Sequence, residues 1–123
     1  MKPVNGYCVF SYRYRDAANF KADGQLLLAG SYSRATSDVI RQRCDMSNWF
    51  VAEQVGIPTL YADLYPFSQG PTSDDVAFHE FDRICPATAK DVGSTRLWGT
   101  VDELVARFQA IKHWDCGLSP HNG

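Results

Sequence analysis

The sequence lacks the segments that would carry a chain into or across a membrane. No apolar run approaches the roughly 18 residues that a membrane-spanning helix needs. The first ten residues contain no apolar stretch of the kind found in a secretory signal peptide. We therefore expect a cytoplasmic protein with no membrane partner.

Motifs for phosphate and metal binding are also missing. The chain has neither G-x-x-x-x-G-K-[ST] nor G-x-G-x-x-G, so no nucleotide cofactor is expected. Candidate metal ligands lie on a short tail or alternate between two faces of a predicted strand, so we expect no metal site. No two cysteines form a C-x-x-C pair. We expect reduced thiols, and two disulfides in a secreted domain are the alternative. The cysteines are Cys8, Cys44, Cys85 and Cys116.

The whole chain has no strong excess of charge of one sign, but two of its segments do. The net charge of −2 excludes a strongly basic nucleic-acid binder. Residues 1–43 hold seven Lys and Arg against three Asp, whereas residues 44–91 hold two cations against eight acids. This asymmetry either orients encounters with a charged partner or reflects two parts of the chain that pack against each other.

Apolar and aromatic residues are plentiful, at 45% and 13% of the 123 residues, which excludes a disordered chain. The length predicts one domain over residues 1–123, with a frayed tail at 118–123. The patterns predict the order ββαββα. We expect an α+β fold, in which two helices cover one face of an antiparallel sheet of about four strands. The predicted strands cover residues 7–15, 25–30, 49–55 and 76–84, and the predicted helices begin near residues 36 and 100.

The alternation in residues 7–15 is the clearest strand signal. Aromatic and apolar side chains fall on one face and Arg13 and Arg15 on the other, so the aromatic face should pack on the core. With Lys21, the two arginines are candidates for an anion-binding or nucleic-acid-binding site. The alternative is a solvated strand face whose cations discourage edge pairing. The apolar face consists of Cys8, Phe10, Tyr12 and Tyr14.

Two later segments carry weaker signals. Residues 76–84 alternate imperfectly, and a β-bulge that brings Phe78 and Phe81 to one face would explain this. Their His79 and Glu80, or a cysteine, are the candidates if the chain is an enzyme, although the sequence shows no activated nucleophile. Thr100 to Glu103 form a predicted capping box at the start of the last helix.

Three segments together resemble a group of small uncharacterised bacterial proteins. They are Tyr-Arg-Tyr-Arg-Asp-Ala-Ala-Asn-Phe-Lys, Trp-Phe-Val-Ala-Glu-Gln-Val-Gly-Ile-Pro and Ala-Phe-His-Glu-Phe. The group has the form Y-R-D-x-x-N-[FY]-K, E-Q-V-G-[IL]-P and H-E-F, and the resemblance covers most of residues 7–111. It implies a bacterial or mobile-element origin, and it implies no activity.

The functional hypothesis follows from the acidic middle segment, the small size and the missing catalytic motifs. We expect a non-enzymatic protein that binds another protein with a basic surface. One concrete form is a phage or mobile-element antagonist of a host defence complex, similar to an anti-CRISPR protein. A small enzyme and a nucleic-acid-binding adaptor are the alternatives, and the oligomeric state stays open. The predicted partner-binding acids are Asp63, Asp74, Asp75, Glu80 and Asp82.

Overall fold

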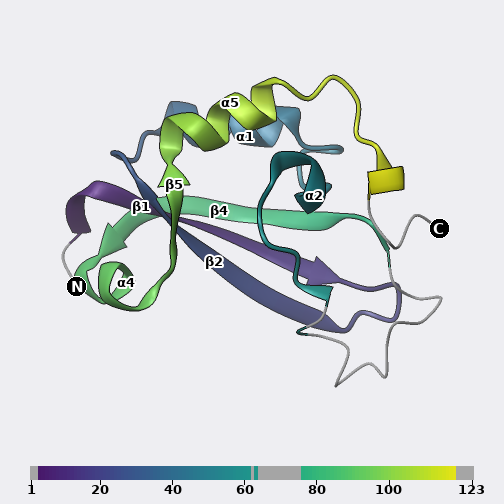
Figure 1. The fold of residues 1–123 in the computed structure, drawn as a ribbon, viewed down its shortest axis with the longest axis horizontal. Helices are drawn as coiled ribbons and strands as arrows, with labels where there is room; N and C mark the ends of the chain where they lie inside the picture. Colours follow the sequence, from purple (N-terminus) through teal and green to yellow (C-terminus); the bar gives the residue numbers. More distant parts are fainter. Residues whose placement is uncertain (1–2, 62, 64–75, 119–123) are drawn as a thin grey trace.

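The computed structural model describes residues 3–61, 63 and 76–118. It shows an α+β fold (Figure 1), which confirms the predicted class. Residues 1–2, 62, 64–75 and 119–123, which include all of the predicted tail except Leu118, lie outside the described residues. The elements are β1 (Pro3–Arg15), β2 (Lys21–Ala29), α1 (Arg34–Arg43), β3 (Trp49–Phe50), α2 (Ala52–Val55), β4 (His79–Thr88), α4 (Ala89–Ser94), β5 (Leu97–Thr100), α5 (Val101–Gln109) and a 3-10 helix, η1 (Cys116–Leu118).

The sheet has five strands in the order β3-β4-β1-β2-β5, so the prediction of about four antiparallel strands was wrong. Strands β1, β2, β3 and β4 pair in antiparallel fashion, but β5 pairs with β2 in parallel. β5 was missed because it is only four residues long and contains Gly99, which weakens any strand signal. The sheet is therefore mixed.

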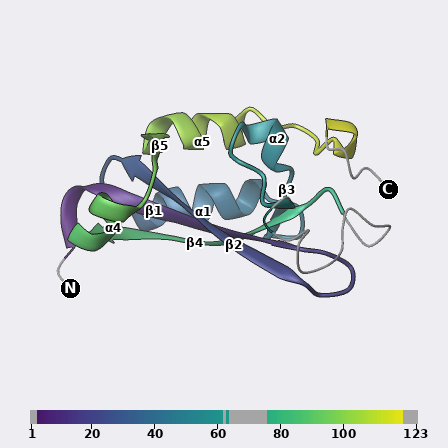
Figure 2. The same cartoon turned by 60° about the horizontal axis from the view of Figure 1, so that its bottom comes forward.

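β1 is the central strand and organises the core. Its alternation places Phe10, Tyr12 and Tyr14 on the face that α1, α2 and α5 cover (Figure 2), as period two predicts. The Phe10 ring lies near the rings of Phe50 and Phe81 and is fully buried. Burial of such aromatic side chains is the main stabilising contribution of this face.

Among the described residues, one helix covers an end of the opposite face of the sheet. There Val9, Leu27 and Ala87 form a second, small buried cluster, against which Val92 of α4 packs. α4 thus lies against the face opposite to the other helices. The prediction of helices on one face alone was wrong, since the connector after β4 contains a six-residue helix with its own apolar contact.

Residues 49–55 were predicted as one strand, and this was wrong. Only Trp49 and Phe50 extend the sheet, whereas Ala52–Val55 form the short helix α2. Gly56 ends this helix with φ 72°, a left-handed conformation that glycine adopts at little cost. Gly56 marks the end of this helix in the sequence, but a glycine at this position is also typical of the end of a strand.

A β-bulge does interrupt β4, although not where it was predicted. Ser11 pairs with Arg83 but Tyr12 pairs with Phe81, so Asp82 is the extra residue. The bulge brings Phe81 and Ile84 to the core face, while Phe78 stays on the other side of the strand start. One inserted residue reverses the face of every later side chain.

Side chains cap the longer helices at their starts. Ser33 caps α1, and Thr100 accepts the Glu103 N–H at the start of α5. The Glu103 carboxylate binds Arg107 one turn later, at 3.0 Å. The complete capping box lies instead at the start of α4, between the N-cap residue Thr88 and Asp91 in the first turn. None of the helices among the described residues has the length and apolarity to span a lipid bilayer.

Candidate functional site

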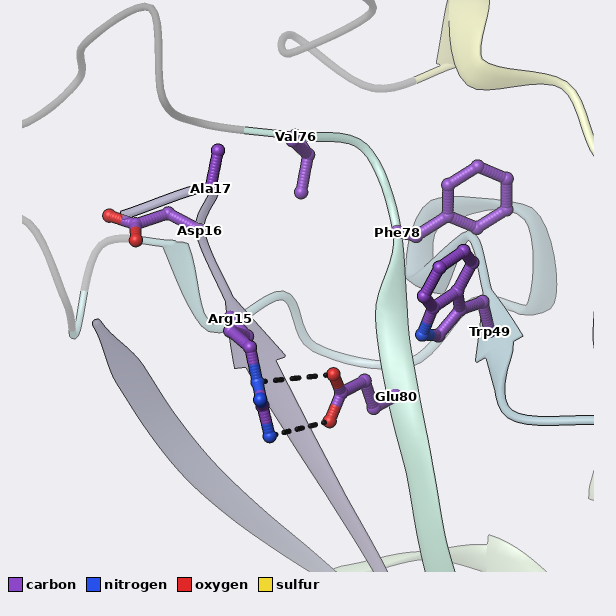
Figure 3. A pocket seen from close by; sticks show the side chains of 7 residues that line it. All are labelled: Arg15, Asp16, Ala17, Trp49, Val76, Phe78 and Glu80. Atoms are coloured by element: carbon purple, nitrogen blue, oxygen red, sulfur yellow. Dashed lines mark hydrogen bonds and ion pairs between the residues drawn. The ribbon is translucent and has the colours of Figure 1, made fainter. Parts of the chain in front are cut away.

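A hollow of about 310 Å³ opens where β1, β3 and β4 end at one side of the sheet (Figure 3). Two aromatic rings, those of Trp49 and Phe78, form one wall. An ion pair between Arg15 and Glu80 lies below them, and the turn after β1 lies opposite. The lining residues are Arg15, Asp16, Ala17, Trp49, Val76, Phe78 and Glu80.

Strand alternation places the charged pair. Arg15 has the parity of the outer face of β1, and Glu80 has that of the outer face of β4, opposite to the core residues of both strands. The Arg15 Nε atom lies 3.2 Å from Glu80 Oε1, and Nη2 donates to Oε2 at 3.5 Å. These contacts are long, and the buried Nε atom makes no hydrogen bond of good geometry. Both side chains are partly exposed, so the pair contributes little to stability.

The aromatic wall is held by a tight turn before β3. Trp49 pairs with Glu80 across the β3–β4 ladder, and its ring centroid lies 6.2 Å from that of Phe78. Met46 and Ser47 both have positive φ in the preceding turn. Arg41 binds the Ser47 carbonyl at 3.0 Å and thereby fixes the turn to α1. Trp49 remains 39% exposed, so its ring is accessible from the solvent.

The three predicted anion-binding residues share the outer face, but two of them have acidic partners. Arg13 donates to Asp23 at 2.7 Å, and this hydrogen bond raises the pKa of Arg13. Arg15 contacts Glu80, as described above. Lys21 is exposed and lies opposite Arg15 on β2. The cations of β1 therefore face acids of the same molecule. Of the two pairs, Arg15–Glu80 joins the basic and acidic parts of the chain, whereas Arg13–Asp23 lies within the basic part.

Three of the five predicted partner-binding acids lie among the described residues. Glu80 lines the hollow, and Asp82 is exposed at the bulge beside Arg83. Asp82 instead lines a second hollow of about 270 Å³ on the outer face, which also contains Arg13 and Arg83. Asp63 is exposed, and Asp74 and Asp75 lie outside the described residues.

His79 lies in the core, on the face opposite to Glu80. Its side chain is fully buried among aromatic rings, and its Nε2 atom accepts the Leu60 N–H at 3.0 Å. Burial lowers the pKa of His79 to about 3, and the nearby Ala77 carbonyl opposes this shift only in part. The Nδ1 atom makes no hydrogen bond of good geometry. The imidazole is therefore neutral and inaccessible, and neither hollow includes it.

The two buried thiols, Cys8 and Cys44, are not activated. All four cysteines are unpaired. Burial raises the pKa of Cys8 to about 11 and that of Cys44 to about 12, so both are protonated at neutral pH. Cys85 packs against the small cluster on the outer face, away from His79. Among the residues that the structure describes, no group of three His, Cys, Asp or Glu side chains converges as metal ligands would.

Sequence reasoning missed the residues that shape the hollow. Trp49 was predicted to lie in a long strand and Phe78 to share a face with Phe81, yet the short β3 and the position of the bulge leave both rings in the wall of the hollow. Asp16 lines the hollow from the turn after β1, where its side chain accepts the Phe20 N–H at 2.9 Å. The usable signal was the parity of Phe78 with Glu80, which places them on one side of the strand.

Comparisons of the chain with protein-family models, with curated proteins and with solved structures found no match. The resemblance to a bacterial group therefore stays a prediction, and the assignment of a site rests on the geometry alone.

Proposed function

We propose that the chain is a protein-binding module and that the hollow beside Trp49 and Phe78 receives a side chain of the partner. The observation that carries this proposal is the combination of two accessible aromatic rings and an Arg–Glu pair in one concavity. Tryptophan and arginine are enriched at the energetic centres of protein interfaces. A concave apolar wall with few polar groups is also the usual form of a binding site.

The chemistry of the hollow fits a partner side chain with an apolar stem and a cationic end. The stem of an arginine or lysine can lie along the rings of Trp49 and Phe78, where the ring faces attract a cation. Glu80 makes only long contacts with Arg15, so its oxygens can accept from a second cation. Such a partner matches the basic surface that the acidic middle segment predicts.

The biological form of this proposal is an antagonist from a phage or mobile element that covers a basic, nucleic-acid-binding surface of a host defence complex. Two observations support it among the described residues. Glu80 lies in the hollow, and Asp82 is exposed two residues further along β4. Opposite charges of this kind steer association and select partners.

A capture experiment with matched variants tests the proposal. The wild-type protein, Trp49→Ala and Tyr32→Ala are immobilised and exposed to a lysate of the organism that encodes the chain. Trp49 and Tyr32 are equally exposed, at 39%, but Tyr32 lies outside the hollow, ahead of α1. We expect a protein that wild type and Tyr32→Ala retain and that Trp49→Ala loses. Capture of the same proteins by all three would contradict the proposed site.

The charge of the partner is tested separately with Glu80→Lys and Asp82→Lys. If a basic partner enters the hollow, Glu80→Lys lowers the affinity more than Asp82→Lys, and the wild-type affinity falls as salt rises. Equal effects of the two reversals would place the contact on the acidic surface as a whole. No effect of either would exclude a charge-directed contact.

A further inference from the structure

Among the residues that the structure describes, none pairs with the outer edge of β2 along about half of the strand. β1 pairs with β2 over its whole length, whereas β5 pairs only with Leu27–Ala29. Leu27 donates its N–H to the Arg96 carbonyl, on the side away from β1. Backbone groups alternate along a strand, so Lys21, Asp23 and Gln25 turn their N–H and C=O groups to the same side. No residue that the structure describes pairs with them there.

This edge differs from the outer edge of β4. The β4 edge is interrupted by the bulge at Asp82, whose carbonyl already accepts from Arg41 at 2.9 Å, and by Pro86, which has no N–H to donate. β2 has neither protection between Lys21 and Gln25. Its Ala22 and Gly24 are small, and Figure 2 shows the β1–β2 hairpin projecting beyond the helical layer. A further strand can approach this part of β2.

We infer that a second copy of this chain pairs with this edge, β2 against β2 in antiparallel orientation. The charges of the edge select the register. With Ala22 opposite Ala22 of the second copy, Lys21 of each copy lies opposite Asp23 of the other. The neighbouring registers place Asp23 against Asp23 or Lys21 against Lys21, which is unfavourable. The edge is thus complementary to itself in one register.

The side chain of Asp23 can serve both contacts. Its carboxylate accepts from Arg13 at 2.7 Å, yet its side chain is 71% exposed, so a second cation can reach it. The paired residues exchange about four backbone hydrogen bonds across the two-fold axis, since each hydrogen-bonded pair contributes two. The contact joins two five-stranded sheets edge to edge. Its small area predicts a weak, reversible dimer.

This inference goes beyond the proposed function and does not depend on it. The hollow lies at the β3–β4 side of the sheet, whereas the free edge lies on the far side of β2. A variant that abolishes self-association should therefore leave capture of a partner protein unchanged, and Trp49→Ala should leave self-association unchanged.

A charge-swap series in sedimentation experiments tests the inference. The wild-type protein should shift from monomer to dimer as its concentration rises from about 10 µM to about 1 mM, the range of a weak contact. Asp23→Lys places cations opposite Lys21 and should keep the protein monomeric, as should Lys21→Asp. The double variant Lys21→Asp/Asp23→Lys restores opposite charges and should restore the dimer. The double variant still places a lysine at position 23 beside Arg13, as Asp23→Lys does. If it nevertheless forms the dimer, a folding defect caused by that lysine does not explain why Asp23→Lys is monomeric.

Crosslinking tests the register. In the proposed register the two Ala22 residues form a non-hydrogen-bonded pair. The Cα atoms of such a pair lie about 4.5 Å apart, within the range of a disulfide. Ala22→Cys should therefore form an intermolecular disulfide under mild oxidation, and Gln25→Cys, which has no copy of itself opposite, should not. A wild-type protein that stays monomeric at the highest concentration would overturn the inference. Crosslinking of both variants to the same extent would overturn the register.

Discussion

At the residue scale, the structure separates side chains whose role the sequence indicates from those that only the tertiary fold defines. The aromatic face of β1 was predicted correctly because period-two alternation is a local property. The pairing of Arg15 with Glu80 was not predictable, since it joins residues 65 positions apart. His79 was a catalytic candidate by residue type alone, and the structure buries its side chain in the core, where no substrate can reach it.

The buried His79 makes stability depend on pH. Its pKa is about 3 in the folded protein, against about 6.5 for an unperturbed histidine. Between these values the unfolded chain binds a proton that the folded protein does not, so stability rises with pH. The histidine imposes no penalty above pH 6.5. Below it, the free energy of unfolding should fall by up to about 1.4 kcal/mol per pH unit, until pH approaches 3.

Urea unfolding at several pH values measures this effect. His79→Gln should be less stable at pH 7, since it disturbs the Leu60 contact, but its stability should depend less on pH than that of wild type. His113→Gln removes an exposed histidine and should keep the wild-type dependence. Identical slopes for wild type and His79→Gln between pH 4 and 6 would show that the ring is not kept neutral.

The side chain of Arg41 in α1 connects three segments of the chain. Its guanidinium binds the Ser47 carbonyl, the Asn48 side chain and the Asp82 carbonyl at the bulge, and it lies over the Phe81 ring. A lysine cannot reproduce this planar set of donors. Arg41→Lys and Arg41→Ala should each lower the free energy of unfolding by about 2 kcal/mol. Arg43→Ala, an exposed neighbour, should change it by less than about 0.5 kcal/mol.

At the scale of elements, the longer helices and strands were predictable and the short ones were not. α1 and α5 have caps and apolar spacing that local sequence encodes. β3, β5 and α2 have two, four and four residues, too few to establish a period. The bulge in β4 was anticipated, but its position depends on which residues of β1 pair with it, and this is tertiary information.

Two glycines should respond to alanine in opposite ways. Gly56 ends α2 with positive φ, and an added Cβ would collide with the Arg107 guanidinium. Gly56→Ala should therefore destabilise the protein by about 1 kcal/mol or more. Gly93 lies inside α4, with nothing within 4 Å of the added atom, so Gly93→Ala should stabilise it by about 0.5–1 kcal/mol. Thermal unfolding measures both, and a loss at Gly93 would contradict the assigned conformation of α4.

At the scale of the whole molecule, part of the charge asymmetry along the chain is paired within the protein. On the outer face of the sheet, Arg15 of the basic part contacts Glu80 of the acidic part, whereas Arg13 contacts Asp23 of its own part. The sequence left two interpretations of this asymmetry open, and the contact between Arg15 and Glu80 favours internal pairing for part of it. The mixed sheet could not be predicted, because β5 reaches β2 only through the chain reversal that α4 provides.

The two buried clusters of the molecule differ greatly in size, and this predicts two levels of stability. The main cluster joins β1, β2, β4 and the helices α1, α2 and α5, with Phe10 near its centre. Phe10→Ala should lower the free energy of unfolding by about 3–5 kcal/mol and weaken all of these elements together. That loss is a large fraction of the 5–15 kcal/mol typical of a domain.

The small cluster should behave differently, because it holds only α4 against the outer face. Val92→Ala removes an apolar contact of α4 but none of the main cluster, so α4 should open locally without global unfolding. Amide hydrogen exchange measures this. Protection should fall in Ala89–Ser94 and stay unchanged in α1 and α5, whereas Phe10→Ala lowers it throughout. An equal loss of protection in α4, α1 and α5 on Val92→Ala would show that both clusters unfold as one unit.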